Sequence, residues 1–169
     1  MSITKASPAD LDSIMSLIRQ AIAVMYQNGI DQWNEDYPGR EIIAGDIETG
    51  TLFKITDRGQ IAGIIVLNNR QSPEYGDLTW QDRSGNFLIV HRLCLHPAFQ
   101  GRGLSKQMMG FAEEHALKNG CTSIRLDTYN KNYIALKLYD SLGYRRVGTV
   151  SFRPGKTFQC FEKVIKLNA

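Results

Sequence analysis

The sequence is poor in the features that mark disulfide frameworks, metal centres and membrane spans. It has three cysteines, Cys94, Cys121 and Cys160, an odd number with no Cys-x-x-Cys pair, which predicts free thiols in a reducing compartment, the cytoplasm. Its three histidines show no metal-ligand spacing, so no metal is expected. No apolar run approaches the roughly 20 residues that cross a bilayer, and the N-terminus lacks the apolar core of a signal peptide, so no membrane partner is expected.

The sequence also lacks an excess of charge of one sign. The 20 lysines and arginines exceed the 17 aspartates and glutamates by a net charge of +3, which is too small to predict a nucleic-acid partner. The chain of 169 residues is long enough to bury a core without metal or disulfide support. Because it has no repeat, low-complexity tract or linker, we expect a single domain over residues 1–169.

Hydrophobic spacing predicts the secondary structure. A helix start is indicated by Ser7, Pro8 and Asp10, and apolar residues follow at helical spacing until Gly29. The turn Asp57-Arg58-Gly59 lies between two β-rich runs and predicts a hairpin. Further helices are predicted over 40–48, 104–119 and 132–142, and strands over 3–6, 51–56, 60–67, 86–95, 122–127, 147–152 and 158–167. The order is β-α-α-β-β-β-α-β-α-β-β, which predicts a mixed α/β fold.

A glycine-rich turn links the strand over 86–95 to the helix that starts near Leu104. Residues 95–106 read LHPAFQGRGLSK. Backbone N–H groups in such a turn, together with the helix dipole, can bind a phosphate. A tight turn that needs left-handed dihedrals and binds nothing would give the same pattern. Neither a P-loop string nor a Gly-x-Gly-x-x-Gly string is present, so nucleotide hydrolases and dinucleotide-binding units are not indicated.

Two linked signatures resemble those of the GNAT (Gcn5-related) N-acetyltransferases. The acyl-CoA loop of that family reads Gln/Arg-x-x-Gly-x-Gly/Ala, and here the string is Gln100-Gly101-Arg102-Gly103-Leu104-Ser105, in which Ser105 departs from the usual Gly or Ala. The second signature is Asn132-x-x-Ala135-x-x-Leu138-Tyr139, followed by Leu142-Gly143-Tyr144. With the element order, the resemblance covers essentially the whole chain.

The resemblance implies a GNAT-like fold, with a central, mostly antiparallel twisted sheet, a splayed parallel strand pair and flanking helices. It implies acetyl transfer from acetyl-CoA, as co-substrate, to a primary amine by direct attack in a ternary complex. We expect a small-molecule amine acceptor. The alternatives are a protein N-terminal or lysine acetyltransferase and a catalytically silent acyl-CoA sensor. The resemblance leaves a homodimer open.

By the same resemblance, the cofactor contacts fall on the strand end, the glycine loop and the second signature. Backbone groups of the strand would pair with the pantetheine, and N–H groups of the loop would bind the pyrophosphate. Asn132 would hydrogen-bond the cofactor, although a helix N-cap is its alternative role. The expected cofactor-binding residues are Leu93, Cys94, Leu95, Gln100, Gly101, Arg102, Gly103, Leu104, Ser105, Lys106, Asn132 and Tyr139.

The implied chemistry assigns three catalytic roles. The N–H of Leu95 would stabilise the oxyanion, and Tyr139 would protonate the leaving thiolate. His91 is a candidate for the general base, because regular strand alternation would place it on the face of Leu93 and Leu95. Glu74 and Asp127 are rival candidates for the base. Acids beside aromatics would suit a cationic amine, so the expected substrate-binding residues are Trp33, Tyr37, Glu74, Tyr75 and Asp127.

Overall fold

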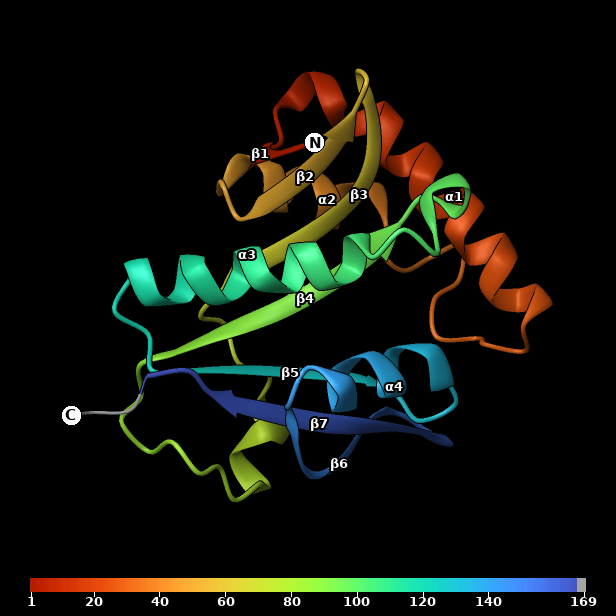
Figure 1. Ribbon diagram of the computed structural model, residues 1–169. Helices are drawn as coiled ribbons and strands as arrows, with labels where there is room; N and C mark the ends of the chain where they lie inside the picture. The colour runs from red at the N-terminus through yellow and green to blue at the C-terminus, as the bar shows by residue number, and fades with distance from the viewer. Residues whose placement is uncertain (167–169) are drawn as a thin grey trace. The chain divides into compact units, whose positions relative to one another are not determined.

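The computed structural model describes residues 1–166, and its secondary structure follows the expected order (Figure 1). The helices are α1 (Leu11–Gln27), α2 (Arg40–Glu48), α3 (Leu104–Lys118) and α4 (Tyr133–Ser141). The strands are β1 (Ser2–Lys5), β2 (Leu52–Asp57), β3 (Gln60–Asn68), β4 (Phe87–Leu95), β5 (Ser123–Tyr129), β6 (Arg145–Arg153) and β7 (Lys156–Val164). In hydrogen-bonded order they run β1-β2-β3-β4-β5-β7-β6 in a mixed sheet. The predicted mixed α/β fold is therefore confirmed.

Most element boundaries lie within two residues of the predicted ones. The strand β6 begins at Arg145 rather than at 147, because two exposed arginines open it and hide the apolar pattern. Sequence reasoning missed the short 3-10 helices η2 (Pro73–Asp77) and η3 (Pro97–Phe99). The predicted end of the last strand, Leu167, lies outside the described residues.

The chain divides into two compact units, and β4 contributes to both. The first unit comprises residues 1–67 and 92–109, and the second comprises 68–91 and 110 onward. No helix within residues 1–166 is both long and apolar enough to cross a lipid bilayer.

The core of the first unit lies between the helices α1 and α2 and the strands β2, β3 and β4. Buried members of this core are Ile14, Leu17, Ile18, Ala21, Ile43, Ile47, Leu52, Ile64, Val66 and Cys94. Asp10 accepts hydrogen bonds from the Ser7 backbone and hydroxyl, as the helix-start signal predicts. The expected hairpin joins β2 to β3, with both Arg58 and Gly59 at positive φ, as a tight two-residue turn requires.

The second unit is built on β5, β7 and β6, with α4 lying along β5 and β7 (Figure 1). Parallel pairing of β4 with β5 runs from Phe87 to Ile89 within the described residues, although both strands continue further. The expected parallel pair is therefore present, and its ladder ends before the strands do. This early end leaves the next backbone groups of β4 without a β5 partner in the ladder.

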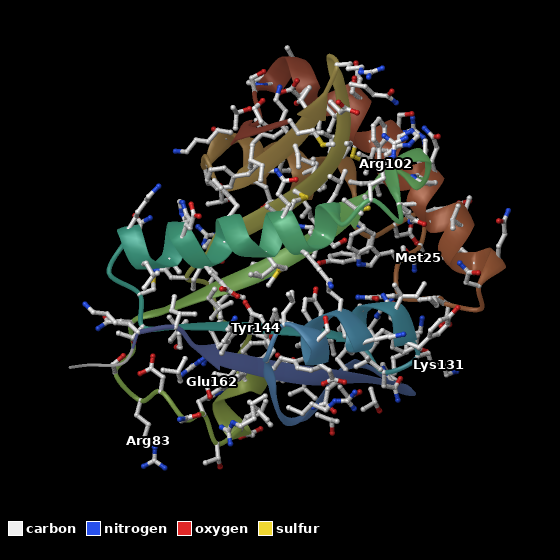
Figure 2. All side chains as sticks on the ribbon, viewed as in Figure 1. Met25, Arg83, Arg102, Lys131, Tyr144 and Glu162 are labelled. Atoms are coloured by element: carbon white, nitrogen blue, oxygen red, sulfur yellow. The ribbon has the colours of Figure 1, made fainter. Side chains whose placement is uncertain are left out.

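Residues 69–86 form an excursion segment between β3 and β4. Within the second unit, charged side chains attach this segment to β7 and to the start of β5. Glu162 of β7, labelled in Figure 2, accepts the N–H groups of Gln81 at 2.7 Å and Asp82 at 3.0 Å. The Asp82 carboxylate accepts the hydroxyls of Thr122 and Ser123, both at 2.6 Å. Burial acts to raise the pKa of Asp82, but these hydrogen bonds outweigh it and hold that pKa well below its usual range.

Candidate active site

The glycine loop, Gln100–Ser105, turns from β4 into α3 in the first unit. Gly101 and Gly103 have φ of +79° and +74°, in the left-handed region that glycine tolerates. A Cβ on either residue would meet no atom within 4 Å, so the dihedral angle and not the space requires glycine. Leu104 is buried and anchors the helix start, while the residues from Gln100 to Gly103 are exposed. The first N–H groups of α3 therefore face outward at the positive end of the helix dipole.

The glycine loop carries one cationic side chain, Arg102, and is followed directly by a second, Lys106. The Arg102 guanidinium, at the start of α3 in Figure 2, lies 5.0 Å from the Phe99 ring centroid and 3.7 Å from the Asp57 carboxylate. Its side chain is half exposed, so both contacts are weak ones that an anion can replace. Lys106 lies in the first turn of α3 and is exposed. The loop therefore combines outward N–H groups with two exposed positive charges.

The end of β4 leads directly into this loop. Leu93 and Leu95 are half-buried, whereas Cys94 is buried in the core, where burial raises the pKa of its thiol to about 12. Gly63 of β3 leaves room for Leu95, because a Cβ there would lie 2.6 Å from the leucine side chain. The thiol of Cys94 is thus a core group, and only its backbone is available to a ligand.

The second unit brings Tyr75 and Asp127 together. The Tyr75 hydroxyl donates to the Asp127 carboxylate at 2.5 Å, across 52 residues of sequence. Tyr75 is itself buried and held by the indole N–H of Trp80, which donates to its carbonyl at 2.9 Å. Asp127 pairs across the strands with the buried Cys160. Poor solvation raises the pKa of Asp127 to about 6, although the Tyr75 hydrogen bond acts in the opposite direction.

No lysine, arginine or histidine of the described chain forms an ion pair with Asp127. A carboxylate in such surroundings is stabilised by an opposite charge. The site therefore favours a cationic group brought by a ligand.

Tyr139 lies on α4 and is buried. Its ring centroid lies 5.4 Å from that of Phe161 and 6.0 Å from that of Tyr144. Burial, and to a lesser extent the charge of Asp127, raises the pKa of the Tyr139 phenol well above its usual value. The phenol therefore stays protonated at neutral pH and is within electrostatic reach of the Asp127 carboxylate.

The other candidates for the general base have different surroundings. The His91 Nε2 lies 2.9 Å from Asn68 Oδ1. Glu74 is half-buried, and its carboxylate accepts a hydrogen bond from the Ser72 hydroxyl, which lowers its pKa. The alternation that was expected to align His91 with Leu93 and Leu95 is interrupted, because Arg92 between them has φ of +49°. A shared face therefore does not follow for these three residues.

The remaining expected ligand-binding residues are Asn132, Trp33 and Tyr37. Asn132 caps α4, since its Oδ1 accepts the N–H of Ala135 at 3.1 Å. Trp33 is buried in the core of the first unit, so it supports the loop over 28–39 from within. Tyr37 of the same loop is 38% exposed, and its hydroxyl accepts a hydrogen bond from Arg92 at 3.1 Å.

Sequence reasoning missed one buried ion pair. Arg92 of β4 binds Asp46 of α2 through two hydrogen bonds of 2.8 Å. The two residues are 46 positions apart, and neither belongs to a periodic pattern or motif. Only the three-dimensional fold brings them together.

The chain is similar to known acetyltransferases in sequence and in structure. The model of the acetyltransferase (GNAT) family matches residues 17–144. An uncharacterized N-acetyltransferase of Bacillus subtilis, YesJ, is 27% identical over 158 residues, which cover 92% of this chain and 86% of that protein. A GNAT-family acetyltransferase crystal structure from Streptococcus agalactiae superposes with a TM-score of 0.86 at 28% identity, covering 98% and 96% of the two chains.

A more distant neighbour was crystallised with a cofactor. The PaiA N-acetyltransferase of Thermoplasma acidophilum, in complex with coenzyme A, superposes with a TM-score of 0.73 at 19% identity. The alignment covers 96% of this chain and 98% of that one. At that identity, the likeness concerns the fold.

Proposed function

The chain belongs to the acetyltransferase (GNAT) family, and from this premise we propose that it transfers the acetyl group of acetyl-CoA to a primary amine of a small molecule. The observation that carries the amine proposal is the Asp127 carboxylate, which is poorly solvated, held by a single tyrosine hydroxyl and without a cationic partner in the described chain. A primary ammonium ion supplies the missing charge. The free thiols of Cys94, Cys121 and Cys160 suit the cytoplasm as its location.

Acetyl-CoA binding is assigned to the glycine loop and the end of β4. The N–H groups from Gly101 to Lys106 would bind the pyrophosphate, with Arg102 and Lys106 adding charge. The backbone of Leu93–Leu95 would pair with the pantetheine, and Asn132 would contact the cofactor while it caps α4. The crystal structure of a neighbour of the same fold in complex with coenzyme A supports acetyl-CoA as the co-substrate.

The reaction removes two protons from the ammonium nitrogen and delivers one proton to the sulfur of CoA. Asp127 takes a proton from the bound ammonium, and the neutral nitrogen attacks the thioester carbonyl. The N–H of Leu95 stabilises the oxyanion, the C–N bond forms, and the C–S bond breaks. The tetrahedral nitrogen gives up its second proton as Tyr139 donates one to the thiolate, so the phenol is reprotonated. Asp127 then releases its proton to solvent, and the products are an amide, free CoA and one proton.

Asp127 suits the role of base better than its rivals. A carboxyl with a pKa of about 6 is mostly ionised at neutral pH yet basic enough to accept a proton. The Glu74 carboxylate, whose pKa is lowered by the Ser72 hydroxyl, is a weaker base. His91 is the competing assignment, and the two are separated by the substitutions described below.

A panel of amines tests the proposed function. Polyamines, aminoglycosides, amino acids and short peptides are each incubated with acetyl-CoA, and the free CoA thiol is measured. The proposal expects turnover with at least one small amine. A preference for peptides would indicate protein acetylation, and binding of acetyl-CoA without turnover on any amine would indicate an acyl-CoA sensor.

Tyr139→Phe tests the proposed acid. We expect the turnover number to fall by at least about tenfold, or about 1.4 kcal/mol, with acetyl-CoA affinity within a few-fold of wild type. The effect is moderate because a thiolate leaves without help more readily than an alkoxide. Tyr144→Phe is the matched control, since it removes a hydroxyl that bonds Glu113 at 3.3 Å in the same unit. Equal turnover in the two variants would reduce Tyr139 to a packing role.

A further inference from the structure

Arg92 adopts a backbone conformation that is unusual for its residue type. Its φ is +49° within β4, and within residues 1–166 the other non-glycine residue with positive φ, Arg58, lies in the β2–β3 hairpin. A left-handed residue inside a strand interrupts its alternation and is strained unless its surroundings hold it. The residues that follow at once are Leu93–Leu95, whose backbone is proposed to bind the pantetheine and the oxyanion.

The side chain of Arg92 forms the contacts that stabilise this backbone conformation. The Nε and one Nη each donate to the Asp46 carboxylate of α2 at 2.8 Å, and both side chains are only 12% exposed. A two-pronged arginine–carboxylate pair fixes the plane of the guanidinium as well as its position. The helix α2 is packed in the core through Ile43 and Ile47, so the ion pair connects the left-handed residue of β4 to an element that is anchored in the core.

The remaining Nη of Arg92 reaches a different segment. It donates to the Tyr37 hydroxyl at 3.1 Å. Tyr37 ends a short turn in which Asn34 Oδ1 accepts the N–H groups of Asp36 and Tyr37. The adjoining Trp33 is buried in the core, so the loop over 28–39 is anchored at Trp33 and tethered at Tyr37. We call this loop the acceptor loop, since it carries Tyr37, one of the residues expected from the sequence to bind the amine.

We propose that Arg92 is a positioning residue that couples the acceptor loop to the acetyl-CoA strand. Asp46 fixes the guanidinium of Arg92. The guanidinium in turn holds the Tyr37 hydroxyl beside the left-handed residue that directly precedes Leu93–Leu95. The assignment of the two ligands rests on the proposed function, whereas the tether itself rests on the contacts alone. The consequence is that the placement of the acceptor loop and the geometry of the oxyanion donor depend on one side chain.

A double-mutant cycle tests the coupling, with the best amine of the panel as acceptor. Tyr37→Phe removes only the tether, so the KM for the amine should rise about three- to tenfold with acetyl-CoA affinity unchanged. Arg92→Lys keeps a positive charge but loses the fork, so kcat should fall about tenfold and the amine KM should rise as well. Tyr37→Phe added to Arg92→Lys should raise the amine KM no further, because the tether is already broken. Equal effects of Tyr37→Phe in both backgrounds would overturn the coupling.

Hydrogen exchange provides a readout that needs no acceptor. Amides of residues 31–37 should exchange faster in Tyr37→Phe and in Arg92→Lys than in wild type. Lys54→Gln is the control, because it breaks a half-buried ion pair of the same unit, with Asp10 at 2.7 Å, that does not involve β4. The control should leave both the exchange of 31–37 and the kinetic constants unchanged, even if it lowers the melting temperature equally. Wild-type exchange in both test variants would refute the tether, whereas inactivity of wild type on every amine would refute only the proposed function.

Discussion

Asp127→Asn is expected to lower the turnover number by about 100- to 10,000-fold near pH 7.5, the usual contribution of a general base. The amide still accepts the Tyr75 hydroxyl hydrogen bond, so the fold and acetyl-CoA affinity should be kept. In wild type, kcat/KM should fall with acid as Asp127 protonates near pH 6. That acidic limb should be absent from the residual activity of the variant. The measurement is a pH–rate profile with saturating acetyl-CoA.

The same substitution should stabilise the protein at high pH. The folded protein holds the Asp127 proton more tightly than the unfolded chain, since the pKa is about 6 rather than 3.8. Wild-type stability is therefore lost as pH rises from about 4 through 6, by up to about 3 kcal/mol. Asparagine carries no charge, so Asp127→Asn should be more stable than wild type at pH 8 and equal to it near pH 4. Chemical denaturation at the two pH values measures the difference.

His91→Ala is the companion variant for this prediction. If Asp127 is the base, the histidine variant keeps the acidic limb and most of its turnover. If instead His91→Ala abolishes the limb while Asp127→Asn retains it, the base is His91 and Asp127 only binds the amine. Either result leaves the stability prediction for Asp127 to be judged on its own.

Gly103→Asp should weaken acetyl-CoA binding by about 30- to 1,000-fold. The residue has φ of +74°, and an L side chain held there costs roughly 1–2 kcal/mol, which binding must supply if the free loop relaxes. A carboxylate beside the pyrophosphate adds repulsion of about 1–2 kcal/mol at a partly screened site. The sum is about 2–4 kcal/mol, and calorimetric titration with acetyl-CoA measures it.

Gly155 offers a closely matched control. It has the same φ of +74° and open space around a built Cβ, but it lies between β6 and β7. Gly155→Asp should lower the melting temperature about as much as Gly103→Asp and leave acetyl-CoA affinity unchanged. Gly103→Ala should show the strain without the repulsion. Wild-type affinity in a folded Gly103→Asp protein would remove the pyrophosphate from this loop.

Local sequence patterns predicted the elements, because helical spacing and turn residues act over a few positions. The apolar spacing from Leu11 to Met25 and the signal at Ser7–Asp10 both describe what the structure contains. The glycine loop was visible for the same reason, since the need for positive φ restricts the residue type to glycine. Features that depend on neighbours in sequence were thus open to prediction.

Contacts between distant residues were not predictable in this way. The Tyr75–Asp127 bond spans 52 positions, and the Arg92–Asp46 pair spans 46. The positive φ of Arg92 left no trace in composition, because a non-glycine residue there is held by tertiary contacts. Trp33 illustrates a further ambiguity, since an aromatic residue among acids can line a pocket or, as here, fill a core.

The anchoring of the excursion segment bears on how this protein can diverge. Glu162 and Asp82 hold the segment largely through backbone N–H groups and small hydroxyls, and every residue except proline offers an N–H. The side chains of Gln81 and Arg83 can therefore change during divergence. Replacing Glu162 or Asp82 removes part of a set of hydrogen bonds that Arg125 completes by donating to Gln71 and to the Asp82 carbonyl. Tyr75 lies on the stretch before these anchors. Selection can thus change exposed residues of this stretch, such as Pro73, Gly76 and Asp77, without removing the hydrogen bonds that attach the segment to β5 and β7.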